Sequence, residues 1–129
     1  MAAAASIVVN DGQATPVAVT FSPEAVSPSL SVFSDRRLGI ASLFPRLGVS
    51  TTFAKGAGSS NRAKFTVTYP VGQTVDGVQK VAYTLRANVE VILPDGATDQ
   101  QRKDLYAFLK NGLSATLVQG ALRDLDPLY

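Results

Sequence analysis

Residues 81–110 read VAYTLRANVEVILPDGATDQQRKDLYAFLK, and within this stretch a strand pattern changes to a helix pattern. Up to Leu93, apolar residues alternate with polar ones, which is typical of a β-strand with one covered face. After Pro94-Asp95-Gly96, Thr98 is a good helix N-cap, and Gln101 three residues later completes a capping-box pattern. This stretch therefore predicts a long strand that is followed directly by a helix.

Two helices are predicted between residues 98 and 125, each with one apolar face, because apolar residues recur there at i, i+3 and i+4. Asn111-Gly112 is a C-terminal stop for the first helix. Ser114 is the predicted cap of the second helix, which extends to about Asp124. The predicted residues of dimer and helix packing are Leu105, Phe108, Leu109, Leu117, Ala121, Leu122 and Leu125.

Before this stretch, the sequence predicts a β-hairpin over residues 6–21, with Asp11-Gly12 as its turn. It also predicts an antiparallel sheet over residues 30–93. The predicted strands of that sheet are 30–34, 49–55, 64–69 and 81–93, and the predicted loops are 22–29, 56–61 and 70–77. Residues 36–47 carry mixed signals, and no element is predicted there. The expected fold class is α+β, a single domain over residues 1–129 with an antiparallel sheet of about five strands and two C-terminal α-helices.

Alternation divides the side chains of the predicted sheet between two faces. One face is aliphatic and aromatic, so it packs against other apolar groups. The other carries hydroxyl, amide and charged groups, so it faces solvent or a polar ligand. The candidate residues on this polar face are Ser50, Thr52, Lys64, Thr66, Thr68, Arg86, Asn88 and Glu90. The simpler interpretation is that small polar side chains only solvate an exposed face.

The two helices are too small to cover the apolar face of the sheet alone. A helix covers a strip about 10 Å wide, whereas five strands span roughly 20–25 Å. The chain is 46% hydrophobic and 17% charged, an apolar excess that suggests a covered surface in so short a chain. A second copy with its own helices solves the burial problem, and a two-fold homodimer is the simplest such arrangement.

Charge is distributed unevenly along the chain. Between Arg36 and Arg86, eight lysines and arginines oppose Asp76 alone, whereas the remaining segments carry four cations and nine acids. A basic middle between acidic ends suits a polyanion on one face of the protein. Chance clustering of solvated side chains is the alternative interpretation.

The composition disfavours several classes of function. The chain has no cysteine and no histidine, which removes disulfides, thiolate nucleophiles, zinc–sulfur sites and the most common general base. We therefore predict no catalytic residue, no metal, no cofactor and no small-molecule substrate. Met1 to Ser6 lacks the basic start of a secretory signal, and no stretch reaches the roughly 20 apolar residues of a membrane span. We expect a soluble protein, intracellular where it is made, without membrane partners.

The order of these elements resembles the coat proteins of single-stranded RNA bacteriophages over nearly the whole chain from Ser6. Three blocks carry the resemblance, and although none is specific alone, together they are hard to obtain by chance. They are Phe21-Ser22-Pro23 to Val26-Ser27-Pro28; Asn61-Arg62 with Lys64-Phe65-Thr66-Val67; and Arg86 to Tyr129, which contains Ala87-Asn88-Val89-Glu90, Thr98-Asp99 and a terminal Leu-Asp-Pro-Leu-Tyr.

The resemblance implies a structural capsid protein of the virion, made in the cytoplasm of a host bacterium. Two subunits would join their sheets edge to edge, with helices over the partner's sheet; the residues alone leave open whether the helices cover their own sheet instead. The homodimers would assemble into an icosahedral shell with the polar face inward on single-stranded RNA. In this family a dimer also binds an RNA hairpin, which represses translation and helps to select the genome. Residues 70–77 resemble the family's loop around the symmetry axes.

The resemblance also implies roles for the polar-face residues. Hydroxyls and Asn88 suit hydrogen bonds to base edges, and Lys64 and Arg86 suit phosphates. Two positions depart from the family. Arg86 stands where several members have a tyrosine that stacks on a base, although a guanidinium plane also stacks. Thr68 stands where some members carry a second cation, so Lys64 bears more of the charge here.

Two other interpretations belong to different classes of protein. A cellular β-rich RNA- or ligand-binding protein that forms no shell would explain the basic middle but not the whole-length order of motifs. A small hydrolase using aspartate and lysine would need paired carboxylates, a phosphate loop or a metal cluster, and the sequence shows no such spacing. Size exclusion of the chain expressed alone separates a nucleic-acid-filled particle from either alternative.

Overall fold

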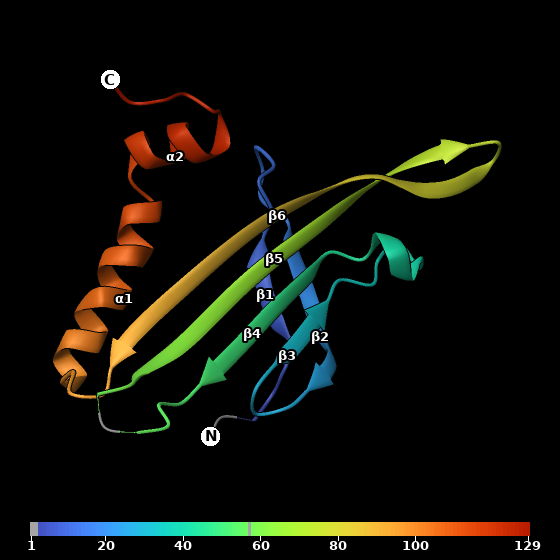
Figure 1. Ribbon diagram of the computed structural model, residues 1–129. Coiled ribbons are helices and arrows are strands. Elements are labelled where there is room, and N and C mark those ends of the chain that lie inside the picture. The colour runs from blue at the N-terminus through green and yellow to red at the C-terminus, as the bar shows by residue number, and fades with distance from the viewer. Residues whose placement is uncertain (1–2, 57) are drawn as a thin grey trace. The chain divides into compact units, whose positions relative to one another are not determined.

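The computed structural model describes residues 3–56 and 58–129 (Figure 1). The chain forms two compact units, one up to Ile92 and one from Leu93 to Tyr129, which we describe separately. Six strands form one sheet in the order β1-β2-β3-β4-β5-β6, so every strand neighbours the next one in the chain. They are β1 (Ile7–Asn10), β2 (Ala18–Val26), β3 (Ser31–Ser34), β4 (Arg46–Thr52), β5 (Ser60–Val75) and β6 (Val78–Pro94). The predicted meander is confirmed, with six strands rather than about five.

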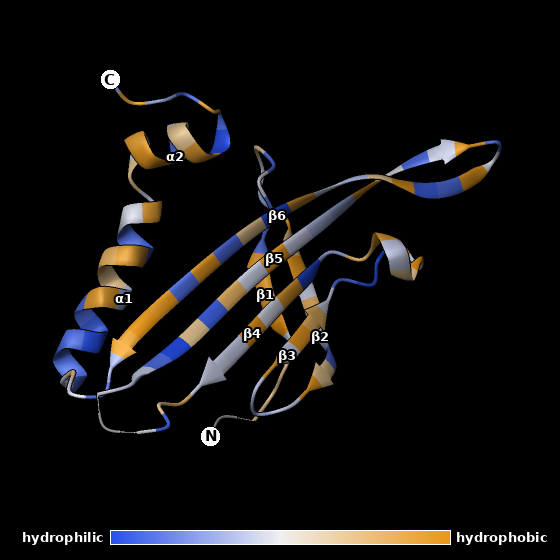
Figure 2. Cartoon of the chain, in the orientation of Figure 1, coloured by the Kyte–Doolittle hydropathy of each residue, from blue (hydrophilic) through white to orange (hydrophobic). Residues whose placement is uncertain are grey.

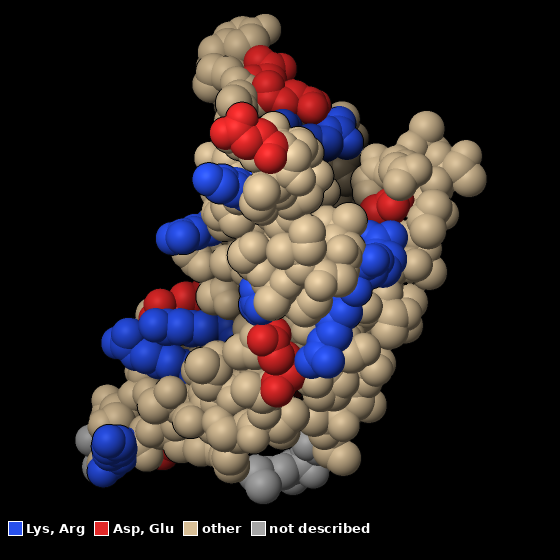
Figure 3. All heavy atoms as spheres, turned by 90° about the vertical axis from the view of Figure 1, so that its right-hand side faces the viewer, with Lys and Arg blue, Asp and Glu red and all other residues tan. Residues whose placement is uncertain are grey.

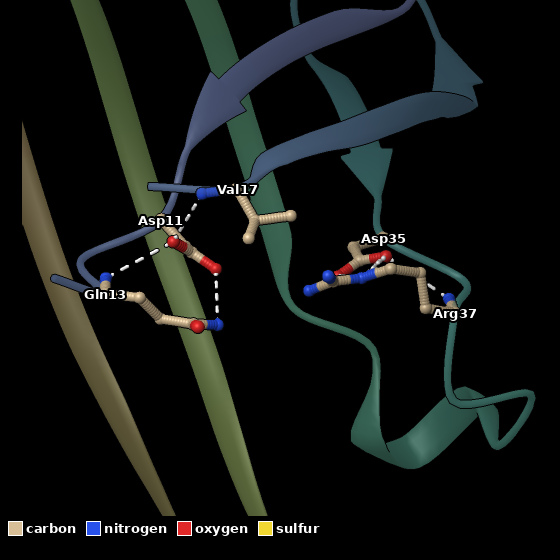
Figure 4. A network of polar contacts seen from close by, with 5 residues as sticks. All are labelled: Asp11, Gln13, Val17, Asp35 and Arg37. Atoms are coloured by element: carbon tan, nitrogen blue, oxygen red, sulfur yellow. Dashed lines mark hydrogen bonds and ion pairs between the residues drawn. The ribbon is translucent and has the colours of Figure 1, made fainter. Parts of the chain in front are cut away.

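The N-terminal hairpin pairs β1 with β2 from Ile7 opposite Phe21 to Asn10 opposite Ala18. The predicted hairpin is confirmed, and its connection, which begins at Asp11-Gly12, runs over residues 11–17, two residues further than the sequence pattern indicated. The Asp11 carboxylate organises this connection by accepting the backbone N–H groups of Gln13 at 3.2 Å and Val17 at 3.0 Å (Figure 4). These bonds, above all the one from Val17, lower the pKa of Asp11.

The second strand continues where the sequence predicted a loop over residues 22–29. β2 extends to Val26 and pairs with β3, with a β-bulge between Pro23 and Ala25. A bulge tolerates proline because it interrupts the ladder of N–H donors. The actual loop is short, and the Ser27 hydroxyl closes it by accepting the Leu30 N–H at 3.1 Å. The first part of the loop prediction is therefore wrong, and the short strand that follows is confirmed.

Residues 36–47, for which no element was predicted, form a turn at Gly39, a single 3-10 turn η1 (Ala41–Leu43) and the start of β4. Leu43 is 3% exposed. A Cβ added at Gly72 of β5 would lie 3.0 Å from both Leu43 methyl carbons. Leu43 therefore packs where Gly72 carries no side chain.

The predicted loop over residues 70–77 is also wrong. β5 continues to Val75, β6 begins at Val78, and only Asp76 and Gly77 connect them, with φ angles of 51° and 77°. Two central residues with positive φ form the turn type that matches the twist of paired strands. The two strands thus form one long hairpin (Figure 1).

The core of this unit lies on one face of the sheet. Its buried residues are Val19 and Phe21 of β2, Phe33 of β3 and Leu47 of β4, with Ile7 of β1 and Val67 of β5 packed against them. Ile7 packs beside its partner Phe21 and Val67 beside its partner Leu47, so the core extends across the sheet from β1 to β5. Figure 1 shows the hairpin of β1 and β2 passing behind β5 and β6, and Figure 2 shows the alternating hydropathy of the long strands.

The second unit contains α1 (Asp99–Leu113) and α2 (Thr116–Arg123). The capping box is confirmed: the Gln101 N–H donates to the Thr98 hydroxyl at 3.2 Å, and the Thr98 N–H donates to the Gln101 side chain at 2.9 Å. The predicted cap at Ser114 is wrong, because Ser114 ends α1 and its hydroxyl donates to the Lys110 carbonyl at 3.3 Å. The N-cap of α2 is Ala115. Within the described ranges, no helix is long and apolar enough to cross a membrane.

Candidate nucleic-acid interface

The register between β4 and β5 brings the candidate residues of both strands onto one face. Ser50 lies opposite Lys64, and Thr52 lies opposite Arg62. Residues directly opposite one another in a ladder point to the same side of the sheet. The face away from the apolar core therefore carries five of the candidates, which are Ser50, Thr52, Lys64, Thr66 and Thr68.

The third strand of this face is β6, and ion pairs fix its orientation. The Glu90 carboxylate lies 3.2 Å from the Arg62 guanidinium and 3.9 Å from the Lys64 ammonium. Glu90 thus points to the same side as Lys64. Alternation along β6 places Asn88 and Arg86 on that side too. The structure brings all eight candidates together on what we call the polar face, which spans β4, β5 and β6.

Glu90 shares its charge between two exposed cations. The side chains of Arg62 and Lys64 are 57% and 53% exposed. Ion pairs this exposed to water contribute about 0–1 kcal/mol to stability, so an incoming phosphate competes for these cations at little cost. Figure 3 shows lysine and arginine side chains close to acidic ones on the side that it presents.

Two further arginines share the polar face and were missed by the sequence interpretation. Arg62 lies two residues before Lys64 in β5, a spacing that repeats the strand period and could have identified it. Arg46 lies opposite Thr68 of β5 and opposite Ser34 of β3. Arg46 and Ser50 are separated by an even number of residues in β4, so the strand period of two could have identified Arg46 as well.

Gly48 leaves the middle of the polar face without a side chain on β4. It lies in β4 between Arg46 and Ser50, opposite Thr66. A Cβ at Gly48 would lie 2.5 Å from the Thr66 hydroxyl oxygen and 4.0 Å from a methyl carbon of Leu30. The Thr66 hydroxyl therefore occupies the space over Gly48, and a side chain at this position would displace it.

A separate polar cluster lies outside the polar face and has a structural role. Asp35, 3% exposed, pairs with the Arg37 guanidinium at 2.9 Å, and Arg37 remains largely exposed (Figure 4). The hydrogen bond with Asp35 raises the pKa of Arg37, and the nearby Asp11 adds to this effect. In the part of the chain that the structure describes, no group of three or more histidine, cysteine, aspartate or glutamate residues is arranged to hold a metal ion.

The family model of the levivirus coat protein matches residues 2–129, which is nearly the whole chain. This chain belongs to the levivirus coat protein family. A coat protein is a structural component of the virion and not an enzyme, so the hydrolase interpretation is excluded. The alternative of a cellular RNA-binding protein is replaced by a capsid role.

Solved structures carry the same fold as this coat protein. The virus-like particle of bacteriophage ESE058 is 26% identical with a TM-score of 0.89, and the match covers 99% of this chain and 100% of that one. The virus-like particle of Beihai levi-like virus 21 is 22% identical with a TM-score of 0.88, covering 97% of each chain. The capsid protein of bacteriophage GA is 18% identical with a TM-score of 0.75, again covering 97% of each. No curated protein sequence matches the chain. The predicted fold class is confirmed.

Proposed function

We propose that this coat protein forms two-fold dimers that assemble into an icosahedral shell around single-stranded RNA, with the polar face toward the RNA. We further propose that a dimer binds an RNA hairpin. This binding would repress translation and would mark the RNA for packaging. The observation that carries the RNA part is the polar face itself. It gathers hydroxyls, an amide and cations from three strands on the side opposite the apolar core.

Each group on the polar face suits a different part of RNA. Threonine and serine hydroxyls and the Asn88 amide both donate and accept hydrogen bonds, as base edges of unstacked nucleotides require. Lys64 and Arg86 supply charge for phosphates. The planar guanidinium of Arg86 can also stack on a looped-out base, which a lysine cannot do.

The helices support the dimer. In the described second unit neither helix has a buried residue, although short helices owe most of their stability to packing of an apolar face. Phe108 is 74% exposed, Leu117 69% and Leu122 65% in the single chain. A partner that covers this face would give the helices the burial that they lack.

The edge of the sheet supports the same arrangement. β6, 17 residues long, is the last strand in the sheet order and therefore has a free edge. A long exposed edge is a template for pairing with another strand. We propose that two copies of β6 pair across the two-fold axis and make one continuous sheet. Related phage proteins form virus-like particles, which favours assembly of these dimers into a shell.

Expression of the chain alone tests the proposal. We expect a large particle in size exclusion whose absorbance at 260 nm exceeds that at 280 nm and whose RNA resists nuclease. The double variant Lys64→Ala, Asn88→Ala should still form shells but lose affinity for a hairpin selected on the wild-type protein from a random-loop library. Loss of a base contact weakens binding by roughly 1–3 kcal/mol, and loss of a phosphate contact weakens binding to all sequences alike.

The control for this experiment is Thr74→Ala, near the tip of the β5–β6 hairpin, which should bind the hairpin as the wild type does. A small monomer free of nucleic acid would contradict the assembly proposal. If the double variant forms shells and its hairpin affinity is unchanged, the polar face does not recognise the hairpin specifically. That result would leave the assembly proposal intact.

A further inference from the structure

Glu24 lies at the β-bulge of β2, on the side of the sheet that carries the polar face. Ser22 pairs with Ser34 and Ala25 pairs with Val32, so the strand contains one more residue than its partner between these pairs. Glu24 follows Ser22 by two residues, so strand alternation already directs it to the side of Ser22 and Ser34, and the bulge shifts Ala25 rather than Glu24 from regular alternation. The Glu24 carboxylate lies 2.9 Å from the guanidinium of Arg46, across the intervening strand β3.

Every nitrogen of the Arg46 guanidinium has a partner within the protein. Nε donates to one Glu24 oxygen at 2.9 Å, and one terminal nitrogen donates to the other at 3.3 Å. The second terminal nitrogen donates to the Phe44 carbonyl at 3.4 Å. The guanidinium carbon also lies 5.6 Å from the centre of the Phe44 ring, a distance at which a cation and an aromatic face attract.

Arg46 therefore differs from the other paired cations of the polar face. Its side chain is 30% exposed, compared with 57% for Arg62 and 53% for Lys64. Arg62 and Lys64 share the single carboxylate of Glu90, whereas Arg46 has a bidentate carboxylate of its own. Bidentate guanidinium–carboxylate pairs are among the strong hydrogen-bonded pairs of proteins. A phosphate that binds Arg46 through Nε and the neighbouring terminal nitrogen would have to displace Glu24, although each terminal nitrogen keeps a second N–H.

We propose that Glu24 withholds Arg46 from RNA phosphates and so confines phosphate binding to the cations of β5 and β6. This inference rests on the proposed RNA-binding function of the polar face. Glu24 acts as a specificity-determining residue: it lowers sequence-independent affinity, which depends on the number of phosphates neutralised, and leaves base contacts unchanged. Specificity is the ratio of the affinity for the cognate RNA to the affinity for other RNA. A carboxylate that weakens only the sequence-independent binding therefore raises this ratio.

The salt dependence of RNA binding tests this inference. The probe is a fluorescent ten-nucleotide oligouridylate, and the proteins are full-length dimers checked by circular dichroism and thermal unfolding. Glu24→Gln should steepen the plot of log affinity against log salt by about 0.7, the value for one additional phosphate on a single strand. Between about 50 and 200 mM salt this amounts to an additional loss of affinity of about 2.6-fold.

Asp76→Asn is the matched control for this variant, because it removes one negative charge at the tip of the β5–β6 hairpin, where asparagine tolerates the positive φ. Its salt slope should equal that of the wild type. The double variant Glu24→Gln, Arg46→Gln should return to the wild-type slope. A slope for Glu24→Gln that equals that of Asp76→Asn would overturn the inference.

A second comparison keeps the inference testable if Glu24→Gln folds poorly. Arg46→Gln should leave the salt slope of the wild type unchanged, whereas Arg86→Gln should reduce it by about 0.7. Equal reductions in both variants would show that Arg46 already binds phosphate and would refute the role of Glu24. If the wild type shows no salt-dependent binding and Arg86→Gln changes nothing, the proposed RNA function itself fails.

Discussion

The Glu24 carboxylate is held in its ionised form by the residues around it. The hydrogen bond from Arg46 is the largest of these influences and lowers the pKa of Glu24, with smaller contributions from Ser34 and from the charge of Arg36. A carboxylate whose pKa is lower in the folded than in the unfolded state binds fewer protons when folded. Its contribution to stability is therefore present above the unfolded pKa and is lost as the pH falls through the folded pKa.

This loss of stability at low pH leads to a prediction for the pair of Glu24 and Arg46. In a double-mutant cycle of Glu24→Gln and Arg46→Gln, the coupling free energy should be favourable at pH 7 and vanish below the acidic transition of Glu24. Because both side chains are about one-third exposed, solvent screening limits the coupling to less than about 1 kcal/mol. Urea unfolding at a fixed protein concentration between pH 3 and 7 measures it. A coupling that persists at the lowest pH would show that charge does not hold the pair.

Strand period was sufficient to predict which side chains share the polar face, but not how their charges are partnered. Lys64, Thr66 and Glu90 follow a period of two, which is visible in the sequence. Glu24 contacts Arg46 because β2 continues past Ser22, through a bulge, where the sequence predicted a loop. A bulge depends on the pairing of two strands, so nothing in the local sequence around Pro23 distinguishes it from a loop.

At the scale of elements, the chain contains two Asp-Gly pairs with different structures. Asp76-Gly77 forms a two-residue turn between strands of 16 and 17 residues. Asp11-Gly12 does not, because the Asp11 carboxylate binds backbone N–H groups further along the connection, and Pro16 has no N–H to offer a ladder. The dipeptide alone therefore predicts a reversal of the chain but not its length.

The turn at Gly77 yields a prediction about the β5–β6 hairpin. Gly77 has a φ of 77° and no atom within 4 Å of an added Cβ, so Gly77→Ala changes only the backbone preference. Left-handed backbone costs a residue with a side chain about 1–2 kcal/mol. Gly12→Ala is the control, since Gly12 has equal free space and no left-handed φ. The free energy of unfolding should fall for Gly77→Ala and stay within about 0.5 kcal/mol for Gly12→Ala; equal values would contradict the turn.

At the scale of the whole molecule, the sequence predicted both that the helices exist and that they need a partner. The capping residues Thr98 and Gln101 are local signals, and the structure confirms them. The need for a partner was inferred from the area of the apolar sheet face, because two short helices cannot cover a sheet of that width. What no local pattern contains is the surface that the helices meet, because that surface belongs to tertiary and quaternary structure.

Phe108 provides the test of the dimer at this scale. Its side chain is 74% exposed in the single chain, so Phe108→Ala should change the stability of a lone chain by no more than about 0.5 kcal/mol. If the apolar face of α1 is covered by a second copy, the same substitution should cost about 3–5 kcal/mol, as in a core. Thermal unfolding at two protein concentrations, together with size exclusion on dilution, distinguishes these outcomes, because dimer stability depends on concentration. Tyr106→Ala is the matched control, being 66% exposed and outside the predicted packing stripe. A Phe108 variant that dissociates no more readily than the Tyr106 variant would place the dimer contact elsewhere, on the free edge of β6 alone.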